Sequence, residues 1–508
     1  MSQQITALQR MEGRRYFGLL MEQGTGKTWA LLADAERLFL QGKIEAVLVI
    51  APNGVHTNWV YREIPTHIGG RVLARAWLSG SGVRATKYMD EVFAPSDDGE
   101  PPPLRILAMN IDALIHKRGY AYALKFLTTY KTMIVLDESS DIKSPETART
   151  KAMMLLRSRA VAARIANGTP ITKAPLDVFA QMEFLRTGLM GTTSYRAFVS
   201  EYAVLLDPNS RQMQNLIAEN PRAQFAQIIA RNVDGTPMWR NLDKLKALLE
   251  PHTYRVTKRE CLDLPEKIYQ NHFFELDPKQ QRAYDLMSDL NRIEVPDSLD
   301  ALSVSALAAL GKLRQITSGF VIKPDGGGVH YVSDGNPRLA ALRTLVAAND
   351  APVIVWAYFQ EELTAIAALL RAMGRRVVEY RGETRRTDRE EAVDAFQRGD
   401  ADAFVGHPQA GGIGLTLTAA QWVVYYSNSF NLRHRLQSED RAHRIGTTGN
   451  VVYIDIVALG TVDVAMARSL QAKMITASIV LGDDARPIPS ENTLCAPGPS
   501  GAVDRLEK

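Results

Sequence analysis

Apolar runs of strand length recur through the first third of the chain, each ending in a polar or turn residue. They occupy residues 15–22, 46–52, 104–110 and 132–139. A segment with helical spacing, residues 28–42, follows the first run and ends in glycine. Such alternation is typical of parallel strands that are buried on both faces and carry function at their carboxyl ends. The pattern predicts an α/β unit.

The alternation resumes in the last third of the chain. Strand candidates occupy 351–358, 375–382, 401–408, 421–428 and 451–460, and helix candidates occupy 361–374 and 389–399. Between the two parts, aromatic and charged residues recur at helical intervals, which predicts a helical insertion. We therefore expect an α/β fold of two lobes, each a mostly parallel sheet with helices on both faces. The expected domains are 1–185, a helical protrusion at 186–265, 266–482 and a flexible tail at 483–508.

Composition narrows the class of protein only slightly. The 508 residues are 46% hydrophobic and carry a net charge of +4, so a nucleic-acid surface would have to be a local feature. Cys261 and Cys495 are too few for a disulfide framework or a cysteine-rich metal site. Neither a signal peptide nor a run of about 18 apolar residues is apparent, which predicts an intracellular protein without a membrane span.

The sequence MEQGTGKT at residues 21–28 joins the first strand to the first helix. Gly24 and Gly26 permit a tight turn that aims backbone N–H groups at phosphate oxygens, together with Gln23 and Thr25. Lys27 would neutralise phosphate charge and Thr28 would offer a hydroxyl to Mg²⁺. An ordinary turn between a strand and a helix is the alternative. The loop predicts that ATP binds here.

Two further patterns fit nucleotide hydrolysis. Asp137 and Glu138 end a strand, where the first would hold the metal ion and the second would polarise the attacking water. Arg441 and Arg444 are three residues apart, so on a helix they would share one face and could reach phosphate oxygens from the second lobe. A solvated acidic turn and a solvent-facing basic helix are the corresponding alternatives.

With these elements in view, the chain resembles superfamily-two helicases, and most closely the Swi/Snf type of ATPase that translocates on double-stranded DNA. That family has no small residue at the start of its first motif, which matches Met21. The resemblance runs through roughly residues 1–475 and is carried by VLVIAPNGVHTNWVYREI, DESSDIKSPET, IANGTPITKAPLDVFAQMEFL, YRVTKRECLDLPEK, LGKLRQITSGF, NPRLAALRTLV, VIVWAYFQEELTAI and GGIGLTLTAAQWVVYYSNSFNLRHRLQSEDRAHRIG.

The resemblance implies two RecA-like lobes and roles for particular residues. Catalysis would involve Lys27, Asp137, Glu138, Gln437, Arg441 and Arg444, with Asp440 orienting the arginines. ATP would be bound by Gln4, Gln23, Gly24, Thr25, Gly26, Lys27, Thr28, Gly412 and Gly414, and Mg²⁺ by Thr28 and Asp137. Gly168, Thr169 and Pro170 would couple hydrolysis to movement of the lobes.

The chain departs from the family pattern in a few places. Ser140 replaces the histidine of the second motif, which bears on coupling more than on hydrolysis. Thr172 and Lys173 replace the glutamine and asparagine that follow the third motif. The upstream glutamine that reads adenine normally follows a proline, and Gln4 lacks that proline.

Small polar side chains at strand ends are candidate contacts to a nucleic-acid backbone: Asn53, Asn110, Arg381, Thr384, Thr416 and Thr418. For each one, a solvated loop is the alternative. The resemblance implies a monomeric motor that grips duplex DNA without reading its sequence, and that moves a DNA-bound protein. A prokaryotic or phage-infected cytoplasm would suit it. A strand-separating DNA or RNA helicase and a DNA-bound scaffold without turnover remain open.

Overall fold

The computed structural model describes residues 1–80, 82–95, 100–219, 221–232, 235–291, 304–323, 328–382, 384–409 and 415–483. The chain divides into two compact units. Met1–Asn232, Pro237–Asp263 and Thr476–Asp484 form the first unit, and Leu264–Ile475 forms nearly all of the described part of the second.

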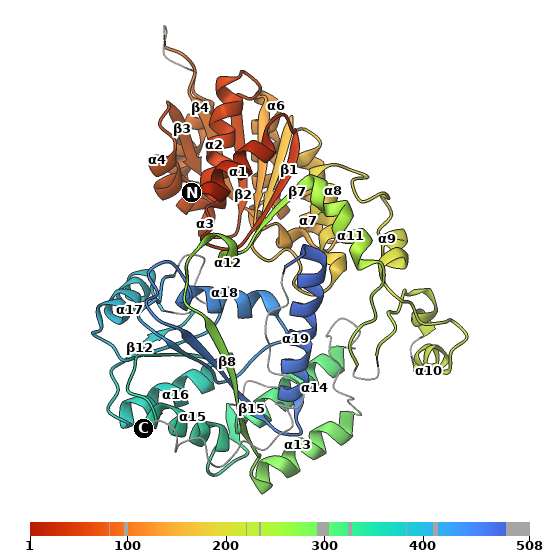
Figure 1. Cartoon of the computed structure of the whole chain (residues 1–508), viewed down its shortest axis with the longest axis vertical. Helices are drawn as coiled ribbons and strands as arrows, with labels where there is room; N and C mark the ends of the chain where they lie inside the picture. Colours follow the sequence, from red (N-terminus) through yellow and green to blue (C-terminus); the bar gives the residue numbers. More distant parts are fainter. Residues whose placement is uncertain are drawn as a thin grey trace. The chain divides into compact units, whose positions relative to one another are not determined.

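The first unit is built on a parallel sheet of seven strands (Figure 1). In spatial order these are β3 (Val72–Ala76), β4 (Leu104–Asn110), β2 (Ala46–Ala51), β5 (Thr132–Asp137), β6 (Ala162–Ala166), β1 (Tyr16–Met21) and β7 (Thr253–Val256). Neighbouring strands pair in parallel, so that β1 lies between β6 and β7. The carboxyl ends of β1, β5 and β6 therefore meet at one edge of the sheet, where the predicted site residues lie.

Helices cover both faces of this sheet because alternate residues of each strand point to opposite sides. On β2, Val47 and Val49 pack with helices α1 to α4, whereas Leu48 and Ile50 pack with α6 to α8. The helices are α1 (Ser2–Met11), α2 (Lys27–Leu40), α3 (Val55–Asn58), α4 (Ile64–His67), α5 (Val83–Asp90), α6 (Lys117–Thr129), α7 (Ala148–Arg157) and α8 (Val178–Leu185). Short turns are the π-helical η1 (Trp59–Glu63) and the 3₁₀ turns η2 (Glu91–Phe93), η3 (Ile111–Ile115), η4 (Ser139–Ile142) and η5 (Pro175–Asp177).

Residues 186–265, expected to be helical, contain helices and one strand. The helical elements are α9 (Tyr195–Tyr202), α10 (Arg211–Glu219), η6 (Pro221–Phe225), α11 (Leu242–Leu249), η7 (Glu250–His252) and α12 (Lys258–Cys261). The same range supplies β7, whose Tyr254 pairs with Leu19 of β1. Phe198 and Leu245 join the core on the α6 face. This range is therefore part of the first unit's sheet and core as well as a set of helices.

The second unit contains a parallel sheet of six strands. Their spatial order is β12 (Val377–Tyr380), β13 (Ala403–Gly406), β11 (Val353–Trp356), β14 (Trp422–Tyr425), β15 (Val451–Ala458) and β8 (Lys267–Phe274). The helices are α13 (Pro278–Asn291), α14 (Val304–Thr317), α15 (Pro337–Ala347), α16 (Gln360–Ala372), α17 (Arg386–Arg398), α18 (Leu432–Ala442) and α19 (Val462–Leu481), of which the residues from Thr476 onward belong to the first unit. A small antiparallel pair, β9 (Phe320–Ile322) and β10 (Val329–Tyr331), completes the unit.

Strand β11 shows the same two-faced burial as β2. Val353 and Val355 pack against α15 and α16, whereas Ile354 and Trp356 pack on the opposite face with α17 and α18. The prediction of two α/β lobes, each with a parallel sheet covered on both faces, is confirmed. Strand β8 was missed because it is an edge strand whose side chains are only partly buried.

Helix α19 is one described helix long and apolar enough to cross a membrane, with a mean hydropathy of 1.2 over its best window. This is weak evidence for a span, because the core helix of a globular protein passes the same test. Ala477 and Val480, near its end, pack into the core of the first unit. From residue 484 onward, the predicted tail lies outside the described residues.

Candidate nucleotide site

The glycine loop connects β1 directly to the amino end of α2. Gly24 and Gly26 have φ angles of 80° and 95°, a left-handed conformation that glycine adopts without strain. The ammonium group of Lys27 donates to the carbonyl oxygens of Met21 at 2.8 Å and Glu22 at 3.0 Å. A left-handed turn that opens a helix of 14 residues presents backbone N–H groups and the positive helix end together. This arrangement suits a phosphate group.

Two glutamines of α1 lie against this loop. A Cβ atom built on Gly26 would lie 2.2 Å from Nε2 of Gln4, so the Gln4 side chain rests directly on the loop. Gln3, which sequence reasoning did not select, is buried and donates to the carbonyl of Thr25 at 3.4 Å. The role of Gln4 in base recognition stays a prediction, and Gln3 supports the loop from α1.

Asp137 ends β5, and both of its carboxylate oxygens have partners in the first unit. Oδ1 accepts the backbone N–H of Glu138 at 3.0 Å. Oδ2 accepts the indole N–H of Trp59, also at 3.0 Å. Trp59 is 2% exposed and begins the π-helical turn η1. Sequence reasoning noted this tryptophan only as part of a family segment, and its contact with Asp137 was missed.

Glu138 has a strained backbone. Its φ angle is 55°, and it is one of three non-glycine residues with positive φ in the described part of the chain. Such a conformation costs about 1–3 kcal/mol and persists where the surroundings enforce it, commonly at functional sites. The residue is also only 6% exposed. Strain and burial together favour a functional role for this carboxylate over a solvated acidic turn.

The loop after β6 lies against the phosphate loop. A Cβ atom on Gly168 would lie 3.3 Å from the backbone nitrogen of Gln23 and 3.5 Å from the carbonyl oxygen of Met21. The backbone N–H of Thr169 donates to Oδ1 of Asn167 at 2.8 Å. The structure therefore brings the predicted coupling loop and the predicted phosphate loop together, with little room for a side chain between them.

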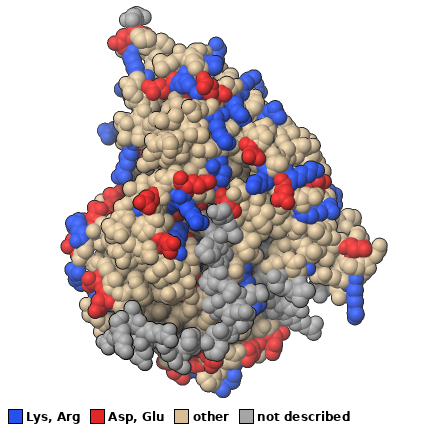
Figure 2. All heavy atoms as spheres, in the orientation of Figure 1, with Lys and Arg blue, Asp and Glu red and all other residues tan. Residues whose placement is uncertain are grey.

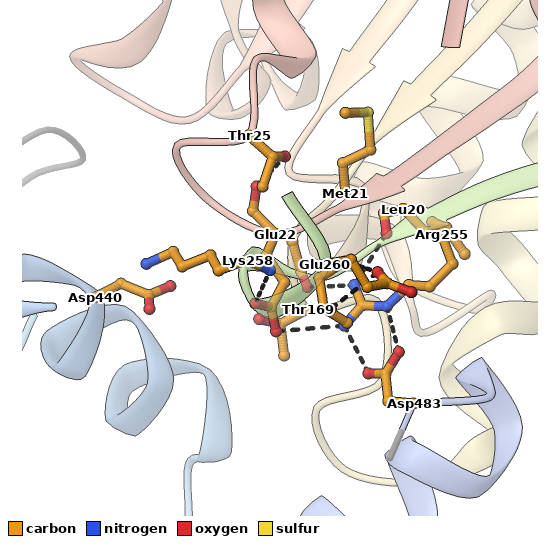
Figure 3. Close-up of polar contacts among 12 residues, drawn as sticks. Leu20, Met21, Glu22, Thr25, Thr169, Arg255, Lys258, Glu260, Asp440 and Asp483 are labelled. Atoms are coloured by element: carbon orange, nitrogen blue, oxygen red, sulfur yellow. Dashed lines mark hydrogen bonds and ion pairs between the residues drawn. The ribbon is translucent and has the colours of Figure 1, made fainter. Parts of the chain in front are cut away.

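Arg255 on β7 connects three parts of this region (Figure 3). Its guanidinium donates to the carbonyl oxygens of Leu20 at 2.9 Å and Gly168 at 3.2 Å. It also donates to both carboxylate oxygens of Asp483 at 2.8 and 2.7 Å, and lies 3.4 Å from Glu22. Sequence reasoning quoted Arg255 without assigning it a role. The sequence feature that could have indicated a role for Arg255 is a charged residue within TYRV, a short stretch of residues that favour β-strands.

Of the two predicted arginines of the second unit, Arg441 lies on helix α18 and Arg444 lies in the turn after it. The expectation that Arg441 and Arg444 share a helix face is wrong, because α18 ends at Ala442. The hydroxyl of Thr447 accepts the Arg444 N–H and donates to the Ala442 carbonyl, which closes a turn instead of another helical turn. Arg444 donates to the hydroxyl of Thr416 at 3.1 Å.

Arg441 is buried on α18. Its guanidinium donates to the carbonyl of Pro408 at 2.8 Å and lies 5.1 Å from the ring centre of Trp356. Burial lowers the pKa of Arg441 to about 10. Gln437 is half-buried on the same helix, and Asp440 lies 3.6 Å from the ammonium of Lys267. Roles for Gln437 and Asp440 in catalysis stay predictions.

An ion network that sequence reasoning missed anchors α18 to its sheet. Arg435 pairs with Glu439 at 2.8 Å and with Asp455 of β15. Glu439 also accepts from Lys267 at 3.0 Å and from the hydroxyl of Tyr269 at 2.8 Å. Arg435 and Glu439 are both buried. They fix the helix that carries Gln437 and Arg441.

The candidate nucleic-acid residues occupy varied environments. Asn53 is exposed in the turn after β2, whereas Asn110 caps η3 by accepting the Ala113 N–H at 2.7 Å. Arg381 donates to Glu379 at 2.8 Å and to Thr364 at 3.1 Å. For Thr418 the partner is Gln397 at 3.1 Å, and Thr384 is half-buried. Gly412 and Gly414, predicted to bind ATP, lie outside the described residues.

The surface in view carries both signs of charge. Figure 2 shows basic and acidic side chains interspersed on this face, as expected from 60 lysines and arginines against 56 acidic residues. Three of these residues contact their own unit: Asn110, Arg381 and Thr418. Each could still bind the phosphate backbone of a nucleic acid, because each has further hydrogen-bonding capacity. Their nucleic-acid role stays a prediction.

Comparison with known families decides the assignment. The profile described as the SNF2-related domain matches residues 8–319, which is more than half of the chain. The chain belongs to the SNF2-related family. A second profile, the helicase conserved C-terminal domain, matches residues 337–446. The SNF2-related profile thus contains the glycine loop, Asp137 and Gly168, and the helicase C-terminal profile contains Arg441 and Arg444.

Relatives of this SNF2-related chain occur in several organisms. A Bacillus subtilis protein with the provisional name ATP-dependent helicase/translocase YwqA is 24% identical over 465 residues, covering 89% of this chain and 45% of that protein. The mouse DNA annealing helicase and endonuclease ZRANB3 is 25% identical, covering 91% of this chain and 39% of that protein. The chain thus spans less than half the length of these curated relatives.

A solved structure was also matched. The Sulfolobus solfataricus SWI2/SNF2 ATPase core in complex with double-stranded DNA is 20% identical, and the alignment covers 96% of this chain and 97% of that one with a TM-score of 0.38.

Proposed function

We propose that this protein hydrolyses ATP and uses the energy to translocate on double-stranded DNA. The observation that carries the proposal is the convergence of the glycine loop, Asp137, Glu138 and the Gly168 loop at one sheet edge of an SNF2-family chain. Each of these parts has a defined task in phosphoryl transfer, where catalysis is mostly positioning and charge stabilisation.

The residues of the first unit divide the chemistry among them. Backbone N–H groups of Gly24 and Gly26 bind phosphate oxygens, and Lys27 adds positive charge. Glu138 accepts a hydrogen bond from the attacking water and orients it. Gln4, resting on Gly26, contributes to binding of the nucleotide. The second unit supplies Arg444 and Arg441, which stabilise charge on the transferred phosphoryl group.

Thr28 and Asp137 would hold Mg²⁺. A hydroxyl and a carboxylate are the hard oxygen donors that this ion prefers, with the remaining positions left to water and phosphate. Among the described residues no group of three or more His, Cys, Asp and Glu could hold a metal ion, which fits a cation bound largely through the nucleotide. When bound, Mg²⁺ would neutralise charge on the phosphates.

Backbone contacts would transmit the cycle to DNA. Asn53 and Asn110 at strand ends of the first unit, with Thr416 and Thr418 in the second, offer hydroxyl and amide groups to phosphate oxygens. Arg381 and Thr384 would add to the grip of the second unit. Such contacts carry no sequence information, so binding is expected to be sequence-independent and to weaken with salt.

The test is ATP hydrolysis measured with duplex DNA, single-stranded DNA and RNA. Stimulation by duplex DNA supports the proposal, and a second assay measures displacement of a triplex strand beside unwinding of a tailed duplex. Triplex displacement without unwinding is the expected result. Unwinding would instead identify a strand-separating helicase, and absence of stimulated turnover would leave a DNA-bound scaffold.

The cellular setting is part of the proposal. Relatives from Bacillus subtilis and Mycoplasma pneumoniae support action in the cytoplasm of a bacterial or phage-infected cell. We expect the motor to act as a monomer and to move a DNA-bound protein. Light scattering with and without duplex DNA measures the oligomeric state, and displacement of a labelled protein roadblock measures the remodelling activity.

A further inference from the structure

Ser140 is a buried residue of the turn that follows Glu138. It stands where the resembling family has a histidine, directly after the strained Glu138 turn. Its side chain is 2% exposed, and its hydroxyl has no hydrogen-bond partner among the described residues. Any link from this turn to the Gly168 loop must therefore pass through other side chains.

The adjacent residue makes such a link. The hydroxyl of Ser139 donates to Oε1 of Gln181 on α8 at 2.6 Å. Nε2 of Gln181 in turn donates to the carbonyl oxygens of Pro170 and Asp177, both at 2.7 Å. Because the amide nitrogen faces two carbonyls, the amide oxygen is the only acceptor left for Ser139. Ser139 and Gln181 are both 0% exposed, so water does not compete for these bonds.

A second connection runs beside the first. Nδ2 of Asn167 donates to the Ser139 hydroxyl at 3.3 Å, and Oδ1 of Asn167 accepts the Thr169 N–H at 2.8 Å. The Ser139 hydroxyl thus both donates and accepts, and it is joined to both sides of the Gly168–Pro170 loop. Lys143 also donates to the hydroxyl of Thr172 at 2.6 Å. Thr172 is one of the residues by which this chain departs from the family pattern.

We propose that Gln181 is a positioning residue that ties the Glu138 turn to the Gly168–Pro170 loop, and so couples hydrolysis to movement of that loop. The inference rests on the proposed function, because coupling needs a reaction to couple. The side chain of Gln181 hydrogen-bonds to Ser139, Pro170 and Asp177, so it would act through these residues and not on the nucleotide itself. The strained backbone of Glu138 is held by its surroundings, and this buried path is part of them.

The test compares Gln181→Leu with two other variants. Leucine keeps most of the side-chain volume and removes the hydrogen bonds to Ser139, Pro170 and Asp177. We expect the kcat of duplex-stimulated hydrolysis to fall at least tenfold while the KM for ATP changes less than twofold, as suits loss of an interaction outside nucleotide binding. Triplex displacement per ATP hydrolysed should fall as well.

Gln280→Leu is the matched control. Gln280 is also fully buried, donates to the Ile316 carbonyl at 2.9 Å, and lies on α13 of the second unit. The Gln280→Leu variant should lower thermal stability about as much as Gln181→Leu does, without changing the triplex displacement per ATP hydrolysed. A similar loss of displacement per ATP in both variants would overturn the proposal, because any buried glutamine would then suffice.

The double variant Ser139→Ala/Gln181→Leu separates positioning from stability. Ser139→Ala removes the buried hydroxyl that Gln181→Leu leaves without its acceptor, but it also takes away the acceptor of Asn167 Nδ2, so the melting temperature should recover in part relative to Gln181→Leu. If Gln181 positions the loop, turnover stays low despite this recovery. Turnover that recovers with stability overturns the inference. Absence of duplex stimulation in the unmodified protein defeats the proposed function itself, whereas stimulated turnover that is unchanged in Gln181→Leu defeats only the inference.

Discussion

The indole N–H of Trp59 donates a hydrogen bond to Oδ2 of Asp137, at 3.0 Å and across 78 residues of sequence. The bond holds the carboxylate from the side of the turn after β2, so that this turn and the end of β5 are fixed to each other. It also connects the segment that contains Asn53, a candidate DNA contact, with the residue proposed to hold Mg²⁺. Trp59 is therefore placed to position the carboxylate that we propose holds Mg²⁺.

Trp59→Phe tests this contact, because it keeps an aromatic ring and removes only the donor. We expect turnover to fall about 10-fold and the Mg²⁺ concentration for half-maximal activity to rise, as for other outer residues that orient metal ligands. Hydrolysis measured against Mg²⁺ concentration checks this. Trp77→Phe is the control, since Trp77 is also buried but packs against Arg118. An unchanged Mg²⁺ dependence in Trp59→Phe would remove the tryptophan from the site.

Lys27→Ala and Glu138→Gln should both abolish hydrolysis, for different reasons. Loss of the ammonium weakens ATP binding as well as turnover, because Lys27 contributes charge to the phosphate cradle. Glu138→Gln leaves that cradle intact and removes the negative charge that would polarise the attacking water. Binding of a fluorescent ATP analogue beside hydrolysis distinguishes the two. Near-normal turnover in Glu138→Gln would show that the water is activated elsewhere.

Glu138→Gly tests the strain at this position. Glycine adopts a φ of 55° readily, so the variant should be at least as stable to unfolding as Glu138→Gln, even though glycine usually destabilises a folded chain. Both variants should lack hydrolysis. Denaturant unfolding of the two proteins measures the difference. A clearly less stable glycine variant would mean that side-chain contacts of residue 138, rather than its backbone, dominate its energetics.

Arg444→Ala should lower turnover by about 10³-fold or more with little change in ATP affinity, as expected of an arginine that acts on the transition state. Stability should change little, since the side chain is only half-buried in a turn. Arg441→Ala differs, because its buried guanidinium packs near Trp356, and we expect it to unfold more easily. Arg398→Ala, which breaks an exposed ion pair with Glu391 on α17, is the control for turnover. An unchanged rate in Arg444→Ala would assign that arginine to the surface.

Arg255→Lys should destabilise the first unit by about 2 kcal/mol, because lysine cannot reproduce the paired bonds to Asp483. Asp483→Asn should have a smaller effect in the same direction. Chemical unfolding curves measure both, and Lys244→Gln, which breaks an exposed pair with Glu201, serves as the control. Equal losses for Arg255→Lys and Lys244→Gln would mean that the Arg255 contacts carry no special weight.

Strands buried on both faces could be predicted from sequence, because their apolar runs are nearly continuous. β2, β4 and β5 were found in this way, whereas the edge strands β7 and β8 were not. β7 has four residues and contains Arg255, and β8 is partly exposed along its length. Edge position alone does not decide the outcome, because the edge strand β12 was predicted from its apolar run whereas the central, fully buried β6 was missed.

In the candidate site, local sequence motifs could be predicted, whereas contacts between residues far apart in the chain could not. The glycine loop and the Asp137–Glu138 turn are local patterns, so sequence could propose them. The Trp59 and Arg255 contacts join residues far apart in the chain, and only the fold brings them together. The helix expected to carry Arg444 ends before this residue for a local reason, because Gly446, with a φ of 101°, and Thr447 favour a turn there.

The hydrogen bonds of the Lys27 ammonium bear on how the glycine loop would receive a nucleotide. The ammonium donates to two carbonyl oxygens of its own loop, and these bonds hold the side chain across the turn where a phosphate group is proposed to bind. A lysine held in place by its own loop needs little rearrangement to meet each new phosphate group, which suits a protein proposed to bind and release nucleotide repeatedly.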